Sequence, residues 1–460
     1  GLISEKMMDL YKGLLLGLHP TWEYDDYPLS DRAKSNGGKL PKMVVGLPGS
    51  EALAPQKVAG MLGRLLEVGY MAVDKMILHA NDQVADPYQA ACIEIAEKYA
   101  DDTHKHLTQY LSDHWKEDVE FSQQYLQGAN PIPLRIVRDF EKEVPANMRH
   151  LKAQGKDVKE LFNEKRLFFA DYYLLEGLDK QAGLHFYAPI VLFFNEHLPN
   201  GEKRLNVVGI RLERTENAAI YTPDMPQKNR WKLAKMFVSN ADNQVHQFAL
   251  HMCLAHFCME PVVVATHNAL PDKHAIKELM LPHLKETIGI NFLARQALIP
   301  RRGALTNKTF SIGTNQGIEI ASYIYKDWSF YKSSFPEELA ARGFDREGTD
   351  GLTNYLYRED GYRLWDLLGT YVTEYVDETY GTDEKLVADA PLQAWAQEMV
   401  DPARGNIPGF PAEFSSKKQL AEALRILIWN GSAFHSILNF PQWPYVGNIP
   451  NRPNAMYAPM

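Results

Sequence analysis

The 460-residue sequence is poor in cysteine and has no long apolar run, and each absence excludes a class of protein. Three cysteines, Cys92, Cys253 and Cys258, do not make a disulfide framework. No uninterrupted stretch of about 18 apolar residues is present, so we expect no membrane-spanning helix. No secretory signal is visible either. The protein is therefore expected to be cytoplasmic or peripherally attached to a membrane.

Positive charge is not in excess. The chain has 49 Lys and Arg against 58 Asp and Glu, a formal net charge of −9. This balance argues against nucleic acid as a partner and against strong attraction to anionic membranes. The hydrophobic fraction of 45% can build a large core. Because no internal repeat, low-complexity tract or linker is evident, one domain over residues 1–460 is the simplest interpretation.

Hydrophobic periodicity predicts a mainly α protein with a small β subregion. A short apolar helix is expected around Leu10, and longer helices over 57–127, 272–298 and 362–401. Within 186–213, two apolar, β-branched runs flank the turn residues Asn200 and Gly201. This pattern predicts a β-hairpin, part of a small sheet on a helical body.

Residues 241–260 contain His246, His251 and His256 at equal intervals among apolar side chains. A helix that is apolar on every side is buried, and an unsatisfied buried polar group costs about 2 kcal/mol or more. Residues five apart do not share a face of a regular α-helix, but they converge where a π-helical turn widens it. We therefore predict that His251 and His256 bind one metal ion with a π-bulge between them. The alternative is core histidines paired with their neighbours.

The surroundings of this helix carry boundary signals. Ser239 and Asn240 interrupt the preceding helical pattern, and either can cap the histidine helix. Pro261 is expected to end it after Glu260, because a residue before proline disfavours helical dihedrals. The two cysteines within the segment can also bind metal, but free cysteine is usually buried packing, and we interpret both as core residues.

A second buried helix is predicted from Ser416, which forms a capping box with Gln419, towards Pro441. Near its end stand His435 and Asn439, which are four residues apart and share a face of an ordinary helix. The alternative for His435 is a histidine at a helix C-terminus that interacts with the helix dipole. Together the two helices offer three imidazoles and one carboxamide. This neutral set suits iron and favours a one-electron oxidant.

These motifs resemble those of the lipoxygenase family. The matching segments are 231–266, 289–298 and 434–445, with weaker matches at 115–131, 221–225 and 392–398. The resemblance thus covers most of the chain from about Trp115 onward, and the paired histidine motifs with the later HxxxN are specific. It implies a large, single, helical catalytic domain of the lipoxygenase type.

The resemblance also implies roles for individual residues. One non-heme iron per chain would be bound by His251, His256, His435 and Asn439, with manganese as the less favoured ion. His246 matches a histidine near the metal that does not bind it. Gln247 and Gln442 match glutamines that link Asn439 to the substrate cavity.

Further positions match the family's substrate pocket. Ala294 matches the position where alanine goes with S-configured hydroperoxides. Leu298 matches a leucine that clamps the reacting carbons, and Thr309 and Phe310 would line the deep end. Plain core packing is the alternative for Leu298 and Phe310. Glu260 and Arg295 also match family positions, and we interpret both as structural.

The implied activity is that of a dioxygenase. Hydrogen abstraction by Fe(III)–OH from a polyunsaturated fatty acid with a cis,cis-1,4-pentadiene, followed by addition of O2, would give a fatty acid hydroperoxide. The substrate would lie in a long apolar pocket. The protein would contact a membrane surface transiently to obtain it. The same ligands also suit a hydroperoxide isomerase or a manganese relative. A non-catalytic lipid-binding relative is a further alternative.

The sequence departs from the family at both ends. No N-terminal β-barrel lipid-binding domain is expected, because the start reads as helical. The family places a last iron ligand, a carboxylate, at the extreme C-terminus. This sequence ends at Met460, 21 residues after Asn439, in a Pro/Asn-rich stretch that we interpret as a loop and not a buried tail. We expect a catalytic domain truncated at its C-terminus rather than one in which Met460 reaches the metal.

Overall fold

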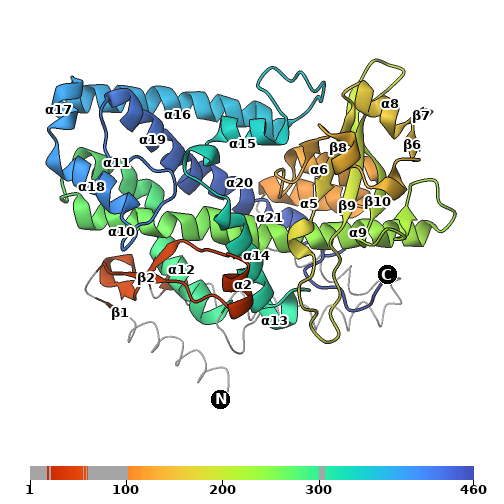
Figure 1. The fold of residues 1–460 in the computed structure, drawn as a ribbon, viewed down its shortest axis with the longest axis horizontal. Coiled ribbons are helices and arrows are strands. Elements are labelled where there is room, and N and C mark those ends of the chain that lie inside the picture. The colour runs from red at the N-terminus through yellow and green to blue at the C-terminus, as the bar shows by residue number, and fades with distance from the viewer. Residues whose placement is uncertain (1–17, 20–21, 55, 59, 61–101, 300–305) are drawn as a thin grey trace.

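The computed structural model describes residues 18–460 except 20–21, 55, 59, 61–101 and 300–305. Helices dominate this part of the chain and carry one five-stranded sheet at one end (Figure 1), which confirms the predicted fold class. The helix expected around Leu10 lies outside the described residues, as does Cys92. Of the helices expected over 57–127, the structure describes α5 (Asp102–His114) and α6 (Asp118–Gln127).

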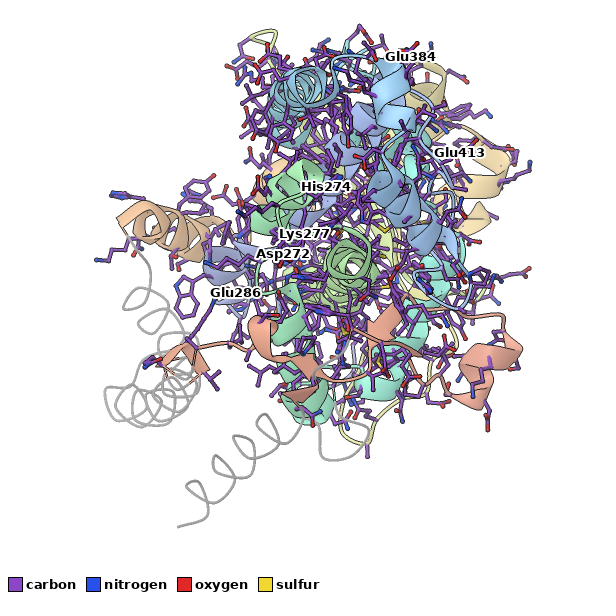
Figure 2. All side chains as sticks on the ribbon, turned by 90° about the vertical axis from the view of Figure 1, so that its left-hand side faces the viewer. Asp272, His274, Lys277, Glu286, Glu384 and Glu413 are labelled. Atoms are coloured by element: carbon purple, nitrogen blue, oxygen red, sulfur yellow. The ribbon has the colours of Figure 1, made fainter. Side chains whose placement is uncertain are left out.

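A continuous helical rod runs through the centre of the molecule from Lys228 to Ala269 (Figure 1). Its parts are α9 (Lys228–Gln244), a π-helix η4 (Val245–His256), a 3-10 turn η5 (Phe257–Met259) and α10 (Glu260–Ala269). By length and composition alone this rod could cross a membrane. However, 78% of its most apolar stretch is buried inside the protein. Figure 2 looks along the rod and shows other elements around it, as for a core helix.

Two predicted boundaries of this rod are wrong. Helix α9 passes through Ser239 and Asn240 without a break, because the buried Asn240 side chain donates 2.9 Å to the carbonyl of Pro453 instead of capping a helix. Pro261 does not end the rod but lies in the first turn of α10. At that position a proline withholds no needed N–H, and its fixed φ suits a helix start.

The sheet is antiparallel throughout, with the strand order β11-β10-β9-β8-β5. The strands are β5 (Arg135–Ile136), β8 (Leu167–Asp171), β9 (Ile190–His197), β10 (Lys203–Arg211) and β11 (Ile220–Tyr221). The hairpin β9–β10 turns at Asn200 and Gly201, as predicted for 186–213. Gly201 takes a φ of +85°, which a residue without Cβ adopts without strain.

Strand β9 is buried on both faces because its side chains alternate between two cores. Val191 and Phe193 belong to the main core, which the sheet shares with the helical body. Ile190 and Leu192 point to the opposite face, into a smaller core built with α7 (Phe140–Glu143) and α8 (Val158–Asn163). The sheet therefore has a helical layer on each side.

The remaining helices pack around the rod or against the helices that cover it. They are α2 (Asp31–Ser35), α11 (Ala275–Leu284), α12 (Thr287–Ala297), α13 (Thr306–Thr309), α14 (Thr314–Lys326), α15 (Phe335–Arg342), α16 (Leu356–Tyr380), α17 (Asp383–Val387), α18 (Ala390–Val400), α19 (Lys417–Ile428), α20 (His435–Asn439) and α21 (Gln442–Val446). The short strands are β1 (Leu18–His19), β2 (Tyr24–Asp26), β3 (Lys42–Val44), β4 (Leu47–Pro48), β6 (Lys152–Ala153) and β7 (Lys156–Asp157).

The second predicted metal-binding helix has three parts. It begins with α19, continues as a second π-helix, η7 (Trp429–Phe434), and ends as α20. The Ser416 side chain caps α19 by accepting from the N–H of Gln419 at 3.3 Å, as predicted. The reciprocal bond of a capping box is shifted by one residue, since Gln419 accepts from the N–H of Ser415. The short regular helix α20 keeps the predicted i, i+4 relation of His435 and Asn439.

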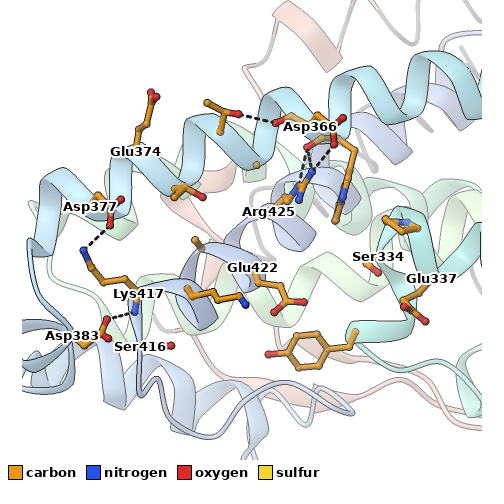
Figure 3. A pocket seen from close by; sticks show the side chains of 18 of the residues that line it. Ser334, Glu337, Asp366, Glu374, Asp377, Asp383, Ser416, Lys417, Glu422 and Arg425 are labelled. Atoms are coloured by element: carbon orange, nitrogen blue, oxygen red, sulfur yellow. Dashed lines mark hydrogen bonds and ion pairs between the residues drawn. The ribbon is translucent and has the colours of Figure 1, made fainter. Parts of the chain in front are cut away.

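A wide cavity of about 1380 Å³ lies between α15, α16 and α19 (Figure 3). Charged side chains line it, and ion pairs join Lys417 to Asp377 and Arg425 to Asp366. None of the predicted site residues is among the described residues that line this cavity. The chemistry predicted from the sequence therefore belongs to another part of the molecule.

Helix α14 packs so closely against the π-helix that a single added methyl group should disturb the contact. A Cβ added at Gly317 would overlap the ring of the buried Phe248. We expect Gly317→Ala to lower the free energy of unfolding by about 1–3 kcal/mol because of this overlap. The loss should occur even though alanine has a higher helix propensity than glycine. Urea unfolding followed by circular dichroism measures this change.

Asn315→Ala is the matched control, because Asn315 is exposed on the same helix. We expect that control to change stability by less than about 0.5 kcal/mol. If both variants were as stable as the parent protein, α14 would not pack closely against the π-helix.

Candidate metal centre

The π-helix brings His251 and His256 to one side of the rod. Their Nε2 atoms are 3.2 Å apart and their ring centroids 4.8 Å apart. Hydrogen bonds from i to i+5 place residues five apart nearly in line, which an α-helix does not do. The predicted local widening is confirmed. It extends beyond one turn, over the 12 residues of η4.

Helix α20 adds a third imidazole. The ring centroid of His435 lies 5.4 Å from that of His251 and 4.4 Å from that of His256. One nitrogen from each of the three rings lies within 4.8 Å of the others, close enough to hold one metal ion. The three histidines therefore converge on one point from two separate helices.

Two observations fit a metal at this point. Metal–imidazole bonds are about 2.1 Å long, so nitrogens on adjacent corners of a coordination polyhedron lie about 3–3.5 Å apart, close to the separation between His251 and His256. Nε2 of His435 is buried without a hydrogen-bond partner. Such an orphaned nitrogen is costly unless a ligand satisfies it.

Burial keeps these imidazoles neutral. It lowers the pKa of His256 to about 3, with a contribution from the charge of His435. It lowers the pKa of His251 well below its usual value, reinforced by the neighbouring histidines, and it also lowers that of His435. Since only the unprotonated imidazole binds a metal, the site is ready for an ion at neutral pH.

The carboxamide of Asn439 lines the same cavity as the three histidines. Gln442 lies beside it, with Nε2 3.5 Å from Asn439 Oδ1 and 3.2 Å from His251 Nδ1. Gln247 of the π-helix donates to Gln442 Oε1 at 2.9 Å. The two glutamines thus connect the rod to the segment after α20, in contact with two of the predicted ligands.

His246 does not point at the convergence point. Its Nε2 lies 2.9 Å from the carbonyl oxygen of Leu438, so this nitrogen carries the proton and donates it to α20. Its Nδ1 is buried without a partner. Burial and the charge of Arg452 lower the pKa of His246 to about 3. This histidine therefore joins the rod to α20 between the positions of His435 and Asn439.

His256 is oriented by a residue that the sequence interpretation missed. Its Nδ1 lies 3.0 Å from Asn291 Oδ1, and Asn291 Nδ2 donates to Glu260 Oε2 at 2.8 Å. Arg295 holds the same carboxylate at 2.8 and 3.0 Å. A proton on Nδ1 leaves Nε2 free for a metal. Glu260 and Arg295 are structural, as predicted, and through Asn291 they also support His256.

A signal for Asn291 was present in the sequence. It stands three residues before Ala294 and four before Arg295, so it shares their face of α12. A buried carboxamide on the face that carries a pocket residue is a natural partner for an imidazole across the cavity wall.

The histidines form one wall of a cavity of about 430 Å³. The predicted residues that line it are Gln247, His251, His256, Ala294, Leu298, Phe310, His435, Asn439 and Gln442. Leu298 is 45% exposed and so is not a core residue. Phe310 makes an edge-to-face contact with Phe248 at 5.3 Å. Other lining residues, including Met252, Phe257, Ile290 and Ile299, carried no distinctive sequence signal.

Thr309 does not line the cavity, contrary to the prediction. It is exposed at the end of α13, whereas Thr306 faces the cavity from the start of that helix. The hydroxyl of Thr306 is held by the carbonyl of Leu298 at 2.8 Å and by the hydroxyl of Thr314 at 2.7 Å. These bonds fix which side of the short helix faces inward.

The two described cysteines are free and buried, as predicted. Cys253 and Cys258 pack with Ala321 and Tyr325 and do not line the metal cavity. Burial raises the pKa of the Cys258 thiol well above its usual value. This thiol is therefore protonated at neutral pH and unsuited to binding a metal.

The segment after α21 is a loop, as predicted. Part of it is buried, contrary to the prediction. Asn451 and Arg452 are 5% and 4% exposed, and Arg452 pairs with Asp242 of the rod at 2.5 Å. Met460 lies elsewhere, with its N–H 3.2 Å from the hydroxyl of Tyr187. It is not among the described residues that line the metal cavity.

Comparisons with known proteins agree with this geometry. Residues 93–460 match the family described as Lipoxygenase. The chain belongs to the lipoxygenase family. Linoleate 9S-lipoxygenase 6 of Solanum tuberosum is 30% identical over 378 residues, and linoleate 9S-lipoxygenase-4 of Glycine max is 32% identical over 380 residues. Each alignment covers 74% of this lipoxygenase chain and 43% of the relative, so the chain spans less than half of their length.

Solved lipoxygenase structures share the fold. A crystal structure titled Delta413-417:GS LOX superimposes with a TM-score of 0.79 at 22% identity, covering 99% of this chain and 67% of that one. A calcium-dependent 11R-lipoxygenase gives a TM-score of 0.74 at 23% identity, covering 98% and 66%. At this identity the likeness concerns the arrangement of the elements. The helical body and the sheet are those of a lipoxygenase.

The Asn291 contact predicts an effect on metal affinity. Asn291→Ala removes the acceptor for the Nδ1 proton of His256, and we expect the metal affinity to fall about 10–100-fold. Competition with a chelator measures this affinity, and circular dichroism checks the fold. Gln296→Ala, at an exposed position of the same helix, is the control and should bind the metal as the parent does. If Asn291→Ala bound the metal as tightly as the parent, the hydrogen bond from His256 to Asn291 would not contribute to metal binding.

His246 predicts a pH dependence of stability. Its pKa is about 3 in the folded chain and about 6.5 in an unfolded one. Below pH 6.5 the unfolded state therefore takes up a proton that the folded state refuses, and stability is lost as pH falls. Between pH 7 and 5 this group should cost about 2 kcal/mol.

We expect His246→Gln, which keeps a donor near Leu438 O, to lose about 2 kcal/mol less than the parent over that interval. The free energy of urea unfolding at both pH values tests this. His150→Gln, at an exposed histidine, should behave as the parent does. Parallel curves for His246→Gln and the parent would contradict a neutral buried His246.

Proposed function

We propose that this chain is the catalytic part of a lipoxygenase that binds one iron ion and oxygenates polyunsaturated fatty acids. The ligands would be His251, His256, His435 and Asn439. One observation carries the proposal: three partly buried, neutral imidazoles, one with an unpartnered Nε2, converge on the wall of a mostly apolar cavity. Curated relatives named linoleate lipoxygenases, and a similar structure titled as a complex with arachidonate, support this class of substrate.

The iron, when bound, supplies the one-electron oxidation that removes a bis-allylic hydrogen atom from the substrate. The chain's own residues determine what reaches it. Neutral nitrogen and amide donors balance less of the charge of a trivalent ion than carboxylates would, and so favour its reduction. The Asn291 contact holds His256 in the tautomer that leaves Nε2 free for the metal before any substrate enters.

Gln442 can orient His251 for metal binding once its side-chain amide has rotated. An imidazole that binds a metal through Nε2 carries its proton on Nδ1, which needs an acceptor. Rotating the Gln442 amide places its oxygen, instead of its nitrogen, beside His251 Nδ1. Gln247 can rotate with it and keep their mutual hydrogen bond. The pair then joins the metal ligands to the cavity wall.

The cavity favours the hydrocarbon part of a fatty acid. Of the described residues that line it, none is Lys, Arg, Asp or Glu. A carboxylate inside would lack a charged partner, so we expect it to stay near the opening of the cavity. Ala294 of α12 and Leu298, directly after that helix, both line the cavity. Because Ala294 matches the family position at which alanine goes with S-configured hydroperoxides, we propose an S-configured product.

The test is the absorbance of conjugated diene formed when the iron-loaded protein meets linoleate in air, recorded with oxygen uptake. We expect diene and oxygen uptake in the parent, and loss of both in His251→Ala together with loss of stoichiometric iron. His197→Ala removes an exposed histidine of β9 and should retain both.

Three results would count against the proposal. Iron retained in His251→Ala would refute the ligand assignment. Iron bound by the parent without diene or oxygen uptake would indicate a non-catalytic relative. Consumption of an added fatty acid hydroperoxide without oxygen uptake would indicate an isomerase.

A further inference from the structure

A separate cavity of about 520 Å³ lies at one end of the five-stranded sheet, where strands β8, β9 and β10 lie together (Figure 1). It shares no described lining residue with the metal cavity. Four cationic residues line it: Arg135, Lys142, Arg211 and Arg214. The protein as a whole carries a net charge of −9, so this concentration of positive charge is local.

The strand register places these arginines together. Arg211 of β10 lies opposite Ile190 of β9, which lies opposite Asp171 of β8. Arg135 of β5 lies opposite Phe169, two residues before Asp171 on the same strand. Opposed residues, and residues two apart, point to the same face of a sheet. The side chains of Arg135 and Arg211 are therefore directed to one face of the sheet by the backbone.

The carboxylates of the cavity leave much of this charge unbalanced. Asp171 and Glu176 pair with Arg214, and Asp139 pairs with Lys142. Glu143 accepts from the N–H groups of Arg138 and Asp139 at 2.6 and 2.8 Å, as a local cap. Of the four cations that line the cavity, Arg135 and Arg211 are the two left without a carboxylate partner among the described residues.

Arg135 and Arg211 have no ion pair within the described part of the chain. Arg211 donates from Nη1 to Asn147 Oδ1 at 3.3 Å, and its Nε is buried without a partner. Arg135 donates from Nη1 to a carbonyl oxygen at 3.5 Å. Burial and the positive charge of Arg214 lower the pKa of Arg211. Both groups have donors to spare, and an anion would relieve their repulsion.

We propose that this cavity binds the phosphate group of a phosphorylated ligand. A phosphate dianion matches the charge of the two guanidinium groups that have no carboxylate partner, whereas a carboxylate matches only one of them. Guanidinium forks bind phosphate oxygens through paired hydrogen bonds. The size of the cavity lies in the range of small-molecule sites.

The rest of the lining indicates what accompanies the phosphate. Phe169 and Ile190 form an apolar floor, and Pro145 lies beside them. Tyr173 is 59% exposed at the cavity and offers a ring for stacking. The ligand should therefore carry an apolar or aromatic part next to its phosphate, either as a soluble phosphomonoester or as a phospholipid headgroup.

Phenyl phosphate is the first probe, and calorimetric titration of the iron-loaded protein is the measurement. We expect it to bind at least about tenfold more tightly than benzoate, which has the same ring and one charge less. Arg135→Ala removes an exposed guanidinium without a carboxylate partner, so the fold should survive. Arg211→Gln keeps a donor near Asn147. Each should weaken binding about tenfold or more.

Arg363→Ala is the charge-matched control, because Arg363 is exposed on α16, away from the sheet. It should bind phenyl phosphate as the parent does. The proposal is overturned if phenyl phosphate fails to bind the parent protein, if benzoate binds equally well, or if Arg363→Ala weakens binding as much as Arg135→Ala.

Vesicles distinguish the two sources of phosphate. Phosphatidylcholine vesicles with and without phosphatidic acid are compared by co-sedimentation. Binding that needs phosphatidic acid, is reduced in Arg135→Ala and competes with phenyl phosphate would identify a lipid headgroup. Phenyl phosphate binding without vesicle binding would identify a soluble phosphomonoester. Both results support the phosphate site, and neither depends on oxygenase activity.

Discussion

Two imidazoles that lie five residues apart can bind one ion only if the helix between them is wider than an α-helix. The rest of the structure follows from this constraint. The wider segment lies in the middle of the core, where α14 approaches it so closely that only glycine fits at position 317. A 3-10 turn then returns the chain to α-helix at Pro261. A second π-helix, η7, lies directly before His435, which adds the third imidazole from a separate helix.

Side chains from distant parts of the sequence fix each imidazole. His251 contacts Gln442, and His256 contacts Asn291, which leads through Glu260 to Arg295 and to the backbone of Val44 at 2.8 Å. His246 holds the carbonyl of Leu438. The positions of the predicted ligands therefore depend on α12, α20 and β3 together. A substitution far from the histidines can disturb them without touching any of them.

The sequence predicted what short-range spacing determines. The five-residue interval implied the π-helix, and Asn200-Gly201 implied the hairpin. It did not predict what distant partners decide. Asn240 looked like a cap but bonds to Pro453, and Pro261 looked like an end but opens the next helix. Asn291 acts on a histidine 35 residues away. Polar residues 451–452 looked exposed because their buried partners lie far upstream. The resemblance to lipoxygenases supplied the ligand set, and spacing alone left core histidines as an alternative.

The polar bonds between the rod and the later loop have a consequence for biosynthesis. Asn240 and Gln244 donate to carbonyl groups at 453 and 454, and Asn243 bonds to the side chain of Asn454, across separations of 210 to 214 residues. Contacts so distant form slowly, since a long chain must first close on itself. While the ribosome is still making residues 270–450, these amides lack their partners and the apolar rod is uncovered. Nascent chains of this protein should therefore need chaperones, and the proposed metal site can be completed only after Asn439 has been synthesised.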